Sequence, residues 1–344
     1  MLYVGMDISS KSFVVHAINE RKKVVLKKQI APSRKELRGL VRELGREPKL
    51  FVFEAGNQLK WVADALKSQE GVSLHVVHPN EVKWISASSG KTDKVDAKKL
   101  AELARGDLLP RKVHLVEGKA RKLRELLGAR TQIMQKRVSL INTLRGYAKQ
   151  EGKHLGEKFF AQKDWEERLM QMNLSETLKT IVIVFRESIE ALKGSELELN
   201  ERIAEIENAQ TKLLETIPAI GVLSSRTLVA ALDDVKRFDN RKAVAKYGAL
   251  TPTIYQSGEV VHLGRINRNG RHEVRRVLLQ CAHLLARMKS PAAKPLREFY
   301  ERLARRSGKK KALVALARKL LTVAYGVLKS GLPFDPAKLL PQGA

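Results

Sequence analysis

The chain opens on residues 2–7, Leu-Tyr-Val-Gly-Met-Asp, a short β-rich run that ends on a carboxylate. Two more such runs follow at residues 12–18 and 24–26, and polar residues separate the three. Short runs bounded by turn residues predict strands that pair with their neighbours in sequence. We therefore expect a three-stranded antiparallel meander at the start of the chain.

A helix and a buried strand are predicted to follow this meander. Ser33 and Glu36 have the spacing of a capping box, which predicts a helix as far as about Leu44. Residues 50–54, Leu-Phe-Val-Phe-Glu, are then typical of a buried strand, and a further helix leads to a strand at residues 74–77. With the helix that follows, the order β-β-β-α-β-α-β-α is that of a ribonuclease-H-like α/β core.

The middle of the chain is predicted to be helical. Residues 120–150 and 175–214 are two long amphipathic stretches with almost no proline. In the first of them, apolar residues recur at spacings of three and four, as at Leu123, Leu126 and Leu127. This pattern predicts an antiparallel helical hairpin or coiled coil, which would act as a spacer or as a dimer contact.

The last third of the chain is predicted to form a mostly α-helical domain. The turn at residues 217–221, Ile-Pro-Ala-Ile-Gly, is similar to helix-hairpin-helix elements, in which backbone amides meet phosphate. Residues 256–258, Gln-Ser-Gly, are expected in a loop, and an arginine-rich helix and two more helices follow. For a chain of 344 residues we therefore expect three domains, at residues 1–112, 113–214 and 215–344.

The composition points to a polyanionic partner. Lys and Arg number 65 against 37 Asp and Glu, a formal charge of +28, and residues 241–344 alone carry 22 of these cations against 5 acids. Nucleic acid is the expected partner, and the last third is where phosphate should lie closest. The sequence has no apolar run of about 18 residues and no signal peptide pattern, so we expect a soluble, cytoplasmic protein without membrane contact. The one cysteine, Cys281, is expected in the core.

Four carboxylates have the placement of a metal-assisted phosphodiester site. Asp7 and Glu54 end the first and fourth strands, and Asp93 and Asp96 lie three apart at the start of a predicted helix. The first and fourth strands are neighbours in a ribonuclease-H fold, so the four acids are expected to converge. Paired Mg²⁺ ions about 3.5–4 Å apart, held by such carboxylates, neutralise the charge that develops on phosphorus.

Each acid also has a structural interpretation. Asp93 is compatible with the N-cap of a helix, and Asp96 with an acid that favours its first turn. A Gly5-x-Asp7 strand also opens the actin-like and sugar-kinase folds, where it supports a nucleotide. The chain has no later glycine-rich phosphate loop, and a charge of +28 is unusual for a kinase, so the four acids in this order favour a nuclease-like core.

Motifs along nearly the whole chain resemble those of the DEDD transposases of the IS110 insertion-sequence family. In chain order they are Gly5-x-Asp7, Glu54-Ala55-x-Asn57, Lys91-Thr92-Asp93-x-x-Asp96-Ala97, Gly248-x-Leu250-Thr251-Pro252 and Gln256-Ser257-Gly258, followed by an Arg-rich helix. The block around Asp93 and Asp96 is the most specific of them. One departure is that residues 266–271 read Ile-Asn-Arg-Asn-Gly-Arg where many members have Ile-Ser-Lys or Ile-Thr-Lys before Gly-Asn.

The resemblance implies a RuvC-like domain, a helical linker and a C-terminal transposase domain that supplies a catalytic serine. It implies Mg²⁺ as cofactor, held by the four acids, and Ser257 as the nucleophile. It also implies donor and target DNA as partners, together with a bridge RNA that is encoded by the element and pairs with both. The protein would then act in a prokaryotic cell, associated with the nucleoid, as a homo-oligomer of two or four copies on DNA.

The chemistry of a serine nucleophile fits strand exchange. A serine that attacks phosphate keeps the bond energy in a phosphoserine ester, so strands are exchanged and resealed without ATP. Arg265, Arg268 and Arg271 follow Ser257 closely in sequence and would stabilise negative charge. Further contacts to phosphate are expected from basic residues on the helices that follow, namely Arg275, Arg276, Lys309, Lys310 and Lys311.

Other interpretations of the serines and of the function stay open at this point. Without the resemblance, Ser257 also fits an ordinary turn residue, and Ser224 and Ser225 compete with it although both are expected to cap a helix. The favoured function is a bridge-RNA-guided serine recombinase. The alternatives are a RuvC-type nuclease that uses water as its nucleophile and a scaffold without catalysis.

The distance along the chain between the two sites suggests how they meet. About 160 residues separate the acids from Ser257, and a helix of some 30 residues within them spans about 45 Å. We therefore expect the acids of one subunit to act with the serine of another, with the helical segments forming the subunit contact.

Overall fold

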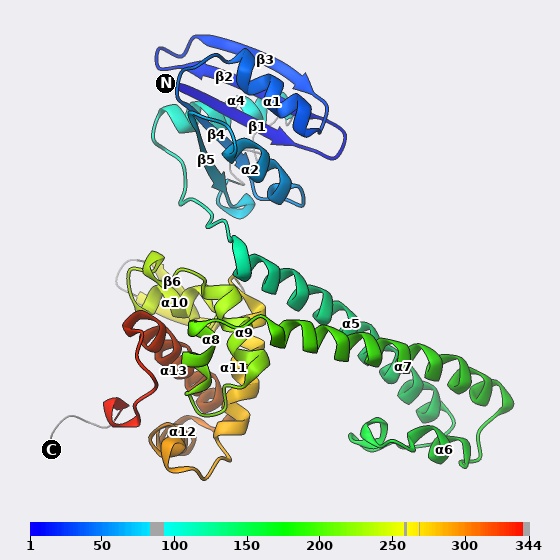
Figure 1. The fold of residues 1–344 in the computed structure, drawn as a ribbon. Coiled ribbons are helices and arrows are strands. Elements are labelled where there is room, and N and C mark those ends of the chain that lie inside the picture. The colour runs from blue at the N-terminus through cyan, green and yellow to red at the C-terminus, as the bar shows by residue number, and fades with distance from the viewer. Residues whose placement is uncertain (83–92, 258–259, 268, 340–344) are drawn as a thin grey trace. The chain divides into compact units, whose positions relative to one another are not determined.

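The computed structural model describes residues 1–82, 93–257, 260–267 and 269–339 (Figure 1). Within these ranges, the structure describes the backbone but not the side chains of residues 93, 94, 256, 257, 261 and 263. The chain divides into two compact units, Met1–Leu115 and Val116–Ala344, which are described separately below. The helical segment expected at residues 113–214 lies almost entirely in the second unit.

The first unit is built on a five-stranded mixed sheet. Its strands are β1 (Leu2–Ile8), β2 (Phe13–Asn19), β3 (Val24–Ile30), β4 (Lys49–Glu54) and β5 (Val72–Val77). In space their order is β3-β2-β1-β4-β5, with β1 antiparallel to β2 and parallel to β4. The expected meander, and the expected neighbourhood of the first and fourth strands, are both confirmed.

Helices cover both faces of this sheet. They are α1 (Arg34–Glu43), α2 (Leu59–Lys67), the 3₁₀ turn η1 (Pro79–Glu81) and α4 (Asp93–Arg105). The Ser33 hydroxyl accepts a hydrogen bond from the Glu36 amide, so the predicted cap of α1 is confirmed. The helices α1 and α2 pack on the face that carries Met6 and Phe53, whereas α4 packs on the face that carries Val52. The unit is therefore a three-layer, ribonuclease-H-like domain.

A glycine sets the distance between α4 and the sheet. A Cβ atom at Gly5 would lie 2.7 Å from the amide nitrogen of Ala101 and would overlap the carbonyl oxygen of Ala97. Ala97 and Ala101 are themselves fully buried. The backbone of α4 therefore lies directly on the backbone of β1, which only a residue without a side chain permits.

The second unit begins with a long helical hairpin. It consists of α5 (Gly118–Gln150), the short η2 (Phe159–Ala161) and α6 (Trp165–Met170), and α7 (Glu176–Glu205), which packs back along α5 (Figure 1). The prediction of one helix through residue 214 was wrong, because α7 ends at Glu205 and α8 (Ala209–Glu215) begins anew. Asn208 caps α8 through a reciprocal capping box with Thr211, and these side-chain bonds compete with continued helix.

A buried carboxylate joins the two long helices. Glu196 of α7 accepts hydrogen bonds from Arg130 at 2.8 Å and from Arg137 at 2.9 Å, both on α5. Asn200, one turn further along α7, accepts from the Nε of Arg130 at 2.6 Å. The Glu196 carboxylate therefore forms ion pairs with both Arg130 and Arg137 inside the helix interface. These pairs fix the register of α7 against α5.

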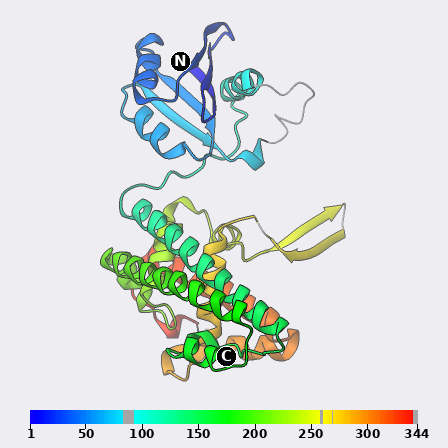
Figure 2. The ribbon, with the colours of Figure 1, turned by 90° about the vertical axis from the view of Figure 1, so that its right-hand side faces the viewer.

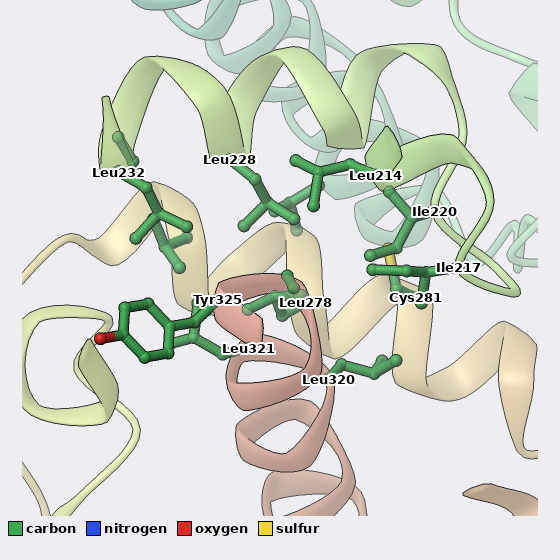
Figure 3. Packing of buried hydrophobic residues seen from close by; sticks show 14 of the residues in the cluster. Leu214, Ile217, Ile220, Leu228, Leu232, Leu278, Cys281, Leu320, Leu321 and Tyr325 are labelled. Atoms are coloured by element: carbon green, nitrogen blue, oxygen red, sulfur yellow. The ribbon is translucent and has the colours of Figure 1, made fainter. Parts of the chain in front are cut away.

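The rest of the second unit is a helical body with one β-hairpin. Its elements are α9 (Val222–Leu232), η3 (Val235–Arg237), α10 (Arg241–Tyr247), β6 (Pro252–Ser257), β7 (Val260–Ile266), α11 (His272–Leu285), η4 (Pro291–Ala293), α12 (Lys294–Ser307), α13 (Lys309–Ser330) and η5 (Pro336–Leu339). Leu228, Leu278 and Leu321 meet in its core, and Cys281 is buried with them as expected (Figure 3). None of the helices in the described ranges is long and apolar enough to cross a membrane.

The hairpin is a departure from the predicted loop. Gln256 and Ser257 belong to β6, and β7 pairs with it in antiparallel register, with Ser257 opposite Val260. The alternating β-branched and aromatic residues on both sides of the turn favour strands over a loop. Figure 2 shows this hairpin extending away from the helical body of its unit.

The Glu196 bridge leads to a prediction about stability. Glu196→Ala leaves two largely buried guanidinium groups without their carboxylate and should destabilise the chain by about 3 kcal/mol, lowering the unfolding temperature. The control is Glu190→Ala on the same helix, because Glu190 pairs with Lys193 at an exposed position. Equal unfolding temperatures for the two variants in calorimetry would contradict a role for Glu196 in holding the hairpin.

Candidate active site and nucleic-acid surface

Two of the predicted acids lie side by side at one edge of the sheet. In the parallel pairing of β1 with β4, Met6 lies opposite Phe53, and Asp7 and Glu54 are the next residue on each strand. Asp7 is half-buried and Glu54 is exposed, and both make contacts within the unit. The sheet therefore brings these two carboxylates to a common edge, as the sequence predicted.

A third acid reaches the same region from α4. Asp96 directly precedes Ala97, whose carbonyl lies against Gly5, two residues before Asp7 on β1. In the part of the chain that the structure describes, the Oδ1 atom of Asp96 is buried and has no hydrogen-bond partner. Burying a polar oxygen without a partner is costly, so this atom indicates a place for a bound cation or donor.

The structure describes less of the fourth acid, Asp93. Asp93 is the first residue of α4, one turn before Asp96, and its side chain lies outside the described atoms. Among the side chains that are described, no three of His, Cys, Asp or Glu are close enough to form a metal cluster. Asp7, Glu54 and Asp96 therefore do not form a metal cluster among the described side chains. Their carboxylate oxygens are nevertheless the donor type that a divalent cation such as Mg²⁺ prefers.

The expected nucleophile lies in the second unit. Ser257 is the last residue of β6, at the turn of the hairpin, and its side chain is outside the described atoms. The competing Ser225 is fully buried in α9, where its hydroxyl donates to Glu215 at 2.7 Å. Ser224 lies within the same helix and accepts from the thiol of Cys281. These two serines therefore have packing roles inside the helical body.

The predicted basic residues differ in what they contact. Arg265 on β7 and Lys309–Lys311 at the start of α13 are exposed, whereas Arg268 lies outside the described residues. The exposed Arg276 donates to Thr131 of α5 at 3.1 Å. Arg275 donates to the carbonyl of Asn267 at 3.2 Å, so part of its guanidinium is already engaged within the unit.

Arg271 belongs to a cluster around Tyr247 that the sequence did not predict. The Tyr247 hydroxyl donates to the Ala231 carbonyl at 2.9 Å and accepts from Arg271 at 3.2 Å and from Arg124 of α5 at 3.4 Å. The guanidinium of Arg237 lies 4.5 Å from the centre of the same ring. Burial raises the pKa of Tyr247, but the three arginines outweigh it and lower that pKa overall.

This cluster forms the root of the hairpin. The Arg271 amide donates to the Tyr247 carbonyl at 2.8 Å, and the Asn267 amide donates to the Thr251 carbonyl at 2.8 Å. Gly270 closes the turn with a φ of +143°, and a Cβ there would lie 2.7 Å from the Tyr247 carbonyl. The two strands that carry position 257 are therefore fixed at their base between α10 and α11.

Comparison with known proteins identifies the class. A transposase model of the DEDD type from the IS110 family matches residues 4–151, and a second model, for transposases of the IS116/IS110/IS902 family, matches residues 211–301. Together with carboxylates at one edge of a ribonuclease-H-like sheet, these matches define a DEDD transposase, an enzyme that cuts and rejoins DNA. The chain belongs to the IS110 family of transposases.

Two individual relatives align over most of the chain, and a third over part of it. A Sinorhizobium fredii protein that carries a transposase name, y4pF/y4sB, is 25% identical over 98% of this chain and 87% of its own length. The transposase for insertion sequence element IS1111A of Coxiella burnetii is 24% identical over 94% of this chain and 89% of its own length. The pilin gene-inverting protein of Moraxella bovis is 34% identical over 37% of this chain and 39% of its own length.

The close contact at Gly5 generates a prediction about the acidic site. Gly5→Ala should force α4 away from β1, lower stability by about 2 kcal/mol and abolish DNA cleavage, because Asp96 moves with the helix. Gly39→Ala is the matched control, since no atom lies within 4 Å of a Cβ at that position in α1. We expect the control to be neutral or slightly stabilising. A Gly5→Ala protein with wild-type melting temperature and cleavage rate would contradict this account of the site.

Proposed function

We propose that this transposase cuts and rejoins DNA through a phosphoserine intermediate on Ser257, with a divalent cation, Mg²⁺, at the acidic site. The observation that carries the metal part is the buried Oδ1 of Asp96, which has no hydrogen-bond partner. Asp96 precedes Ala97, which packs against β1 near the edge where Asp7 and Glu54 lie at the ends of β1 and β4. The serine part is supported by the position of Ser257 at the end of a hairpin and by the packing roles of Ser224 and Ser225.

The proposed reaction at Ser257 is a phosphoryl transfer. The serine oxygen forms a bond to phosphorus while the bond from phosphorus to the leaving strand breaks, and the leaving oxygen takes up a proton. The serine hydroxyl gives up its proton in the same step. In the reverse direction, the hydroxyl of a new strand attacks phosphorus and releases the serine, so no external energy source is needed.

The acidic residues would hold the metal. Asp7, Glu54 and Asp96 supply three carboxylates from two strands and a helix, and Asp93 would supply the fourth. When bound, Mg²⁺ would neutralise the negative charge that develops on the transferring phosphate. Without it, the carboxylates would repel the phosphodiester, which is why both features are expected to act together.

The basic residues would hold the DNA backbone. The exposed Arg265, Lys309, Lys310 and Lys311 are suited to contact phosphate directly, and Arg276 is exposed beside α5. Arg271 and Arg275 would act from the hairpin root, where they already donate to Tyr247 and to Asn267. Arg268 is proposed from its place in the sequence alone.

A guide RNA and an assembly of several copies complete the proposal. The resemblance to the IS110 family and the charge of +28 support a bridge RNA that pairs with donor and target DNA. Assembly of copies on the DNA would let the acids of one subunit meet Ser257 of another. A RuvC-type nuclease with water as nucleophile is the alternative, and it differs in leaving no protein–DNA bond.

The RNA part has its own test. RNA that copurifies with the full chain from cells carrying the insertion element should be a discrete, structured transcript of the DNA flanking the gene. Sequencing that RNA provides the measurement, and RNA from a charge-matched basic protein purified in parallel is the control. A sample that mirrors total cellular RNA would reject a dedicated guide.

The catalytic proposal is tested with two substitutions and two readouts. In Mg²⁺ the wild type should form a denaturant-resistant adduct with DNA, and Ser257→Ala should form none, whereas Ser307→Ala should behave as wild type. Asp96→Asn should abolish the adduct and also the rise in melting temperature that Mg²⁺ gives the wild type. Without Mg²⁺ its melting temperature should equal or exceed the wild-type value, because a buried charge is removed.

Other outcomes of this experiment identify the alternatives. Mg²⁺-dependent cleavage without an adduct would support the nuclease that uses water. No Mg²⁺-dependent reaction at all, in the presence of the copurified RNA, would favour a scaffold without catalysis. An unchanged Mg²⁺ stabilisation in Asp96→Asn would reject the acidic site as the place of the cation.

A further inference from the structure

The β6–β7 hairpin presents large apolar side chains to solvent. Ile254 is 61% exposed, Tyr255 is 64% exposed and Val260 is 57% exposed. The hairpin extends from the helical body of its unit, so these side chains are not at the edge of a packed core (Figure 2). Clustered exposure of this kind on a projecting element is typical of a binding surface.

Two of these side chains lie on the face of the hairpin to which position 257 belongs. Tyr255 pairs with His262 and Ser257 pairs with Val260, and directly paired or alternate residues share a face of a β-ribbon. The ring of Tyr255 lies over Gly264, where a Cβ would come within 3.0 Å of the ring. Positions 255, 257 and 260 therefore share one face of the ribbon.

The charge of the surrounding unit indicates the partner. Residues 241–344 carry a net charge of +17, and the hairpin rises from a root that holds three arginines around Tyr247. A second copy of this chain would bring the same excess of positive charge, which opposes pairing of two such hairpins. A polyanion with apolar surfaces between its charges matches both the exposed apolar side chains and the positive charge. Duplex DNA is such a polyanion, because its base faces and edges lie between its phosphates.

We propose that the β6–β7 hairpin is a DNA-binding ribbon whose Tyr255 and Val260 press against the bases next to the phosphate that Ser257 attacks. A two-stranded ribbon fits a groove of B-DNA, and apolar side chains that enter a groove partly unstack a base step. The apolar contact would hold the duplex while the basic helices neutralise its backbone. That Tyr255 and Val260 lie next to the phosphate that Ser257 attacks rests on the proposed function. That the ribbon binds DNA does not rest on it.

The experiment separates apolar from electrostatic binding through its salt dependence. Dissociation constants are measured over a range of salt concentrations for a mixed-sequence 40-bp duplex and for 40-bp duplexes spanning the ends of the insertion element. The double variant Tyr255→Ser with Val260→Ser should bind each duplex about tenfold more weakly with an unchanged log-log slope, because no ion release is lost. Replacing Lys309, Lys310 and Lys311 by Gln should instead flatten the slope, by up to about three units.

Matched variants control for folding and for general apolar exposure. Leu284→Ser on α11 removes another large side chain of the same unit, 55% exposed, and should leave the affinity unchanged. Tyr255→Phe keeps the ring and should bind like the wild type. Only variants whose melting temperature matches that of the wild type are compared, so that differences in binding do not reflect folding. All of them carry Ser257→Ala, so that binding is measured without reaction.

Three results would overturn the ribbon as a DNA-binding surface. The double variant could bind all duplexes like the wild type. It could lose affinity for a 40-bp RNA duplex while binding the DNA duplexes like the wild type, which would indicate an RNA surface. Without nucleic acid, the wild type could self-associate while the double variant stays monomeric, which would indicate a protein interface. A wild type that forms no Ser257 adduct would defeat the proposed function and leave the ribbon result standing.

Discussion

The contact between the backbones of α4 and β1 at Gly5 is the constraint on which the acidic site depends. Asp7 and Glu54 are placed by the sheet alone, because parallel pairing of β1 with β4 brings them to one edge. Asp96 is placed by α4, and the helix reaches that edge only because Gly5 has no side chain. The candidate acidic site would therefore depend on a sheet and a helix whose backbones pack directly on each other.

Much of the first unit was predictable because its signals are local. Polar turns bound each strand, and the Ser33 cap begins α1 where its spacing with Glu36 places it. The end of α7 was missed because Asn208 acts through a capping box rather than through a proline or glycine. The hairpin was missed because Gln256-Ser257-Gly258 suggests a loop, whereas the alternation around it decides for strands.

The environment of the basic residues was not predictable, because it depends on contacts between distant parts of the chain. Arg124 lies 123 positions before Tyr247, yet it donates to the Tyr247 hydroxyl, as Arg271 does at the base of the hairpin. The net charge identifies a polyanionic partner but does not distinguish a cation that faces solvent, such as Lys310, from one that donates to its own protein, such as Arg275. For the same reason the sequence alone could not separate Ser225, buried in α9, from Ser257.

The way the hairpin is rooted has a consequence for how related chains diverge. Its base is held by backbone hydrogen bonds from Asn267 and Arg271 and by Gly270, none of which involves the residues toward the turn. Substitutions near the turn therefore leave α10 and α11 undisturbed. Apart from Ser257, the residues near the turn can then change without disturbing the fold, and if the hairpin binds DNA as proposed, changes in DNA preference would be concentrated there.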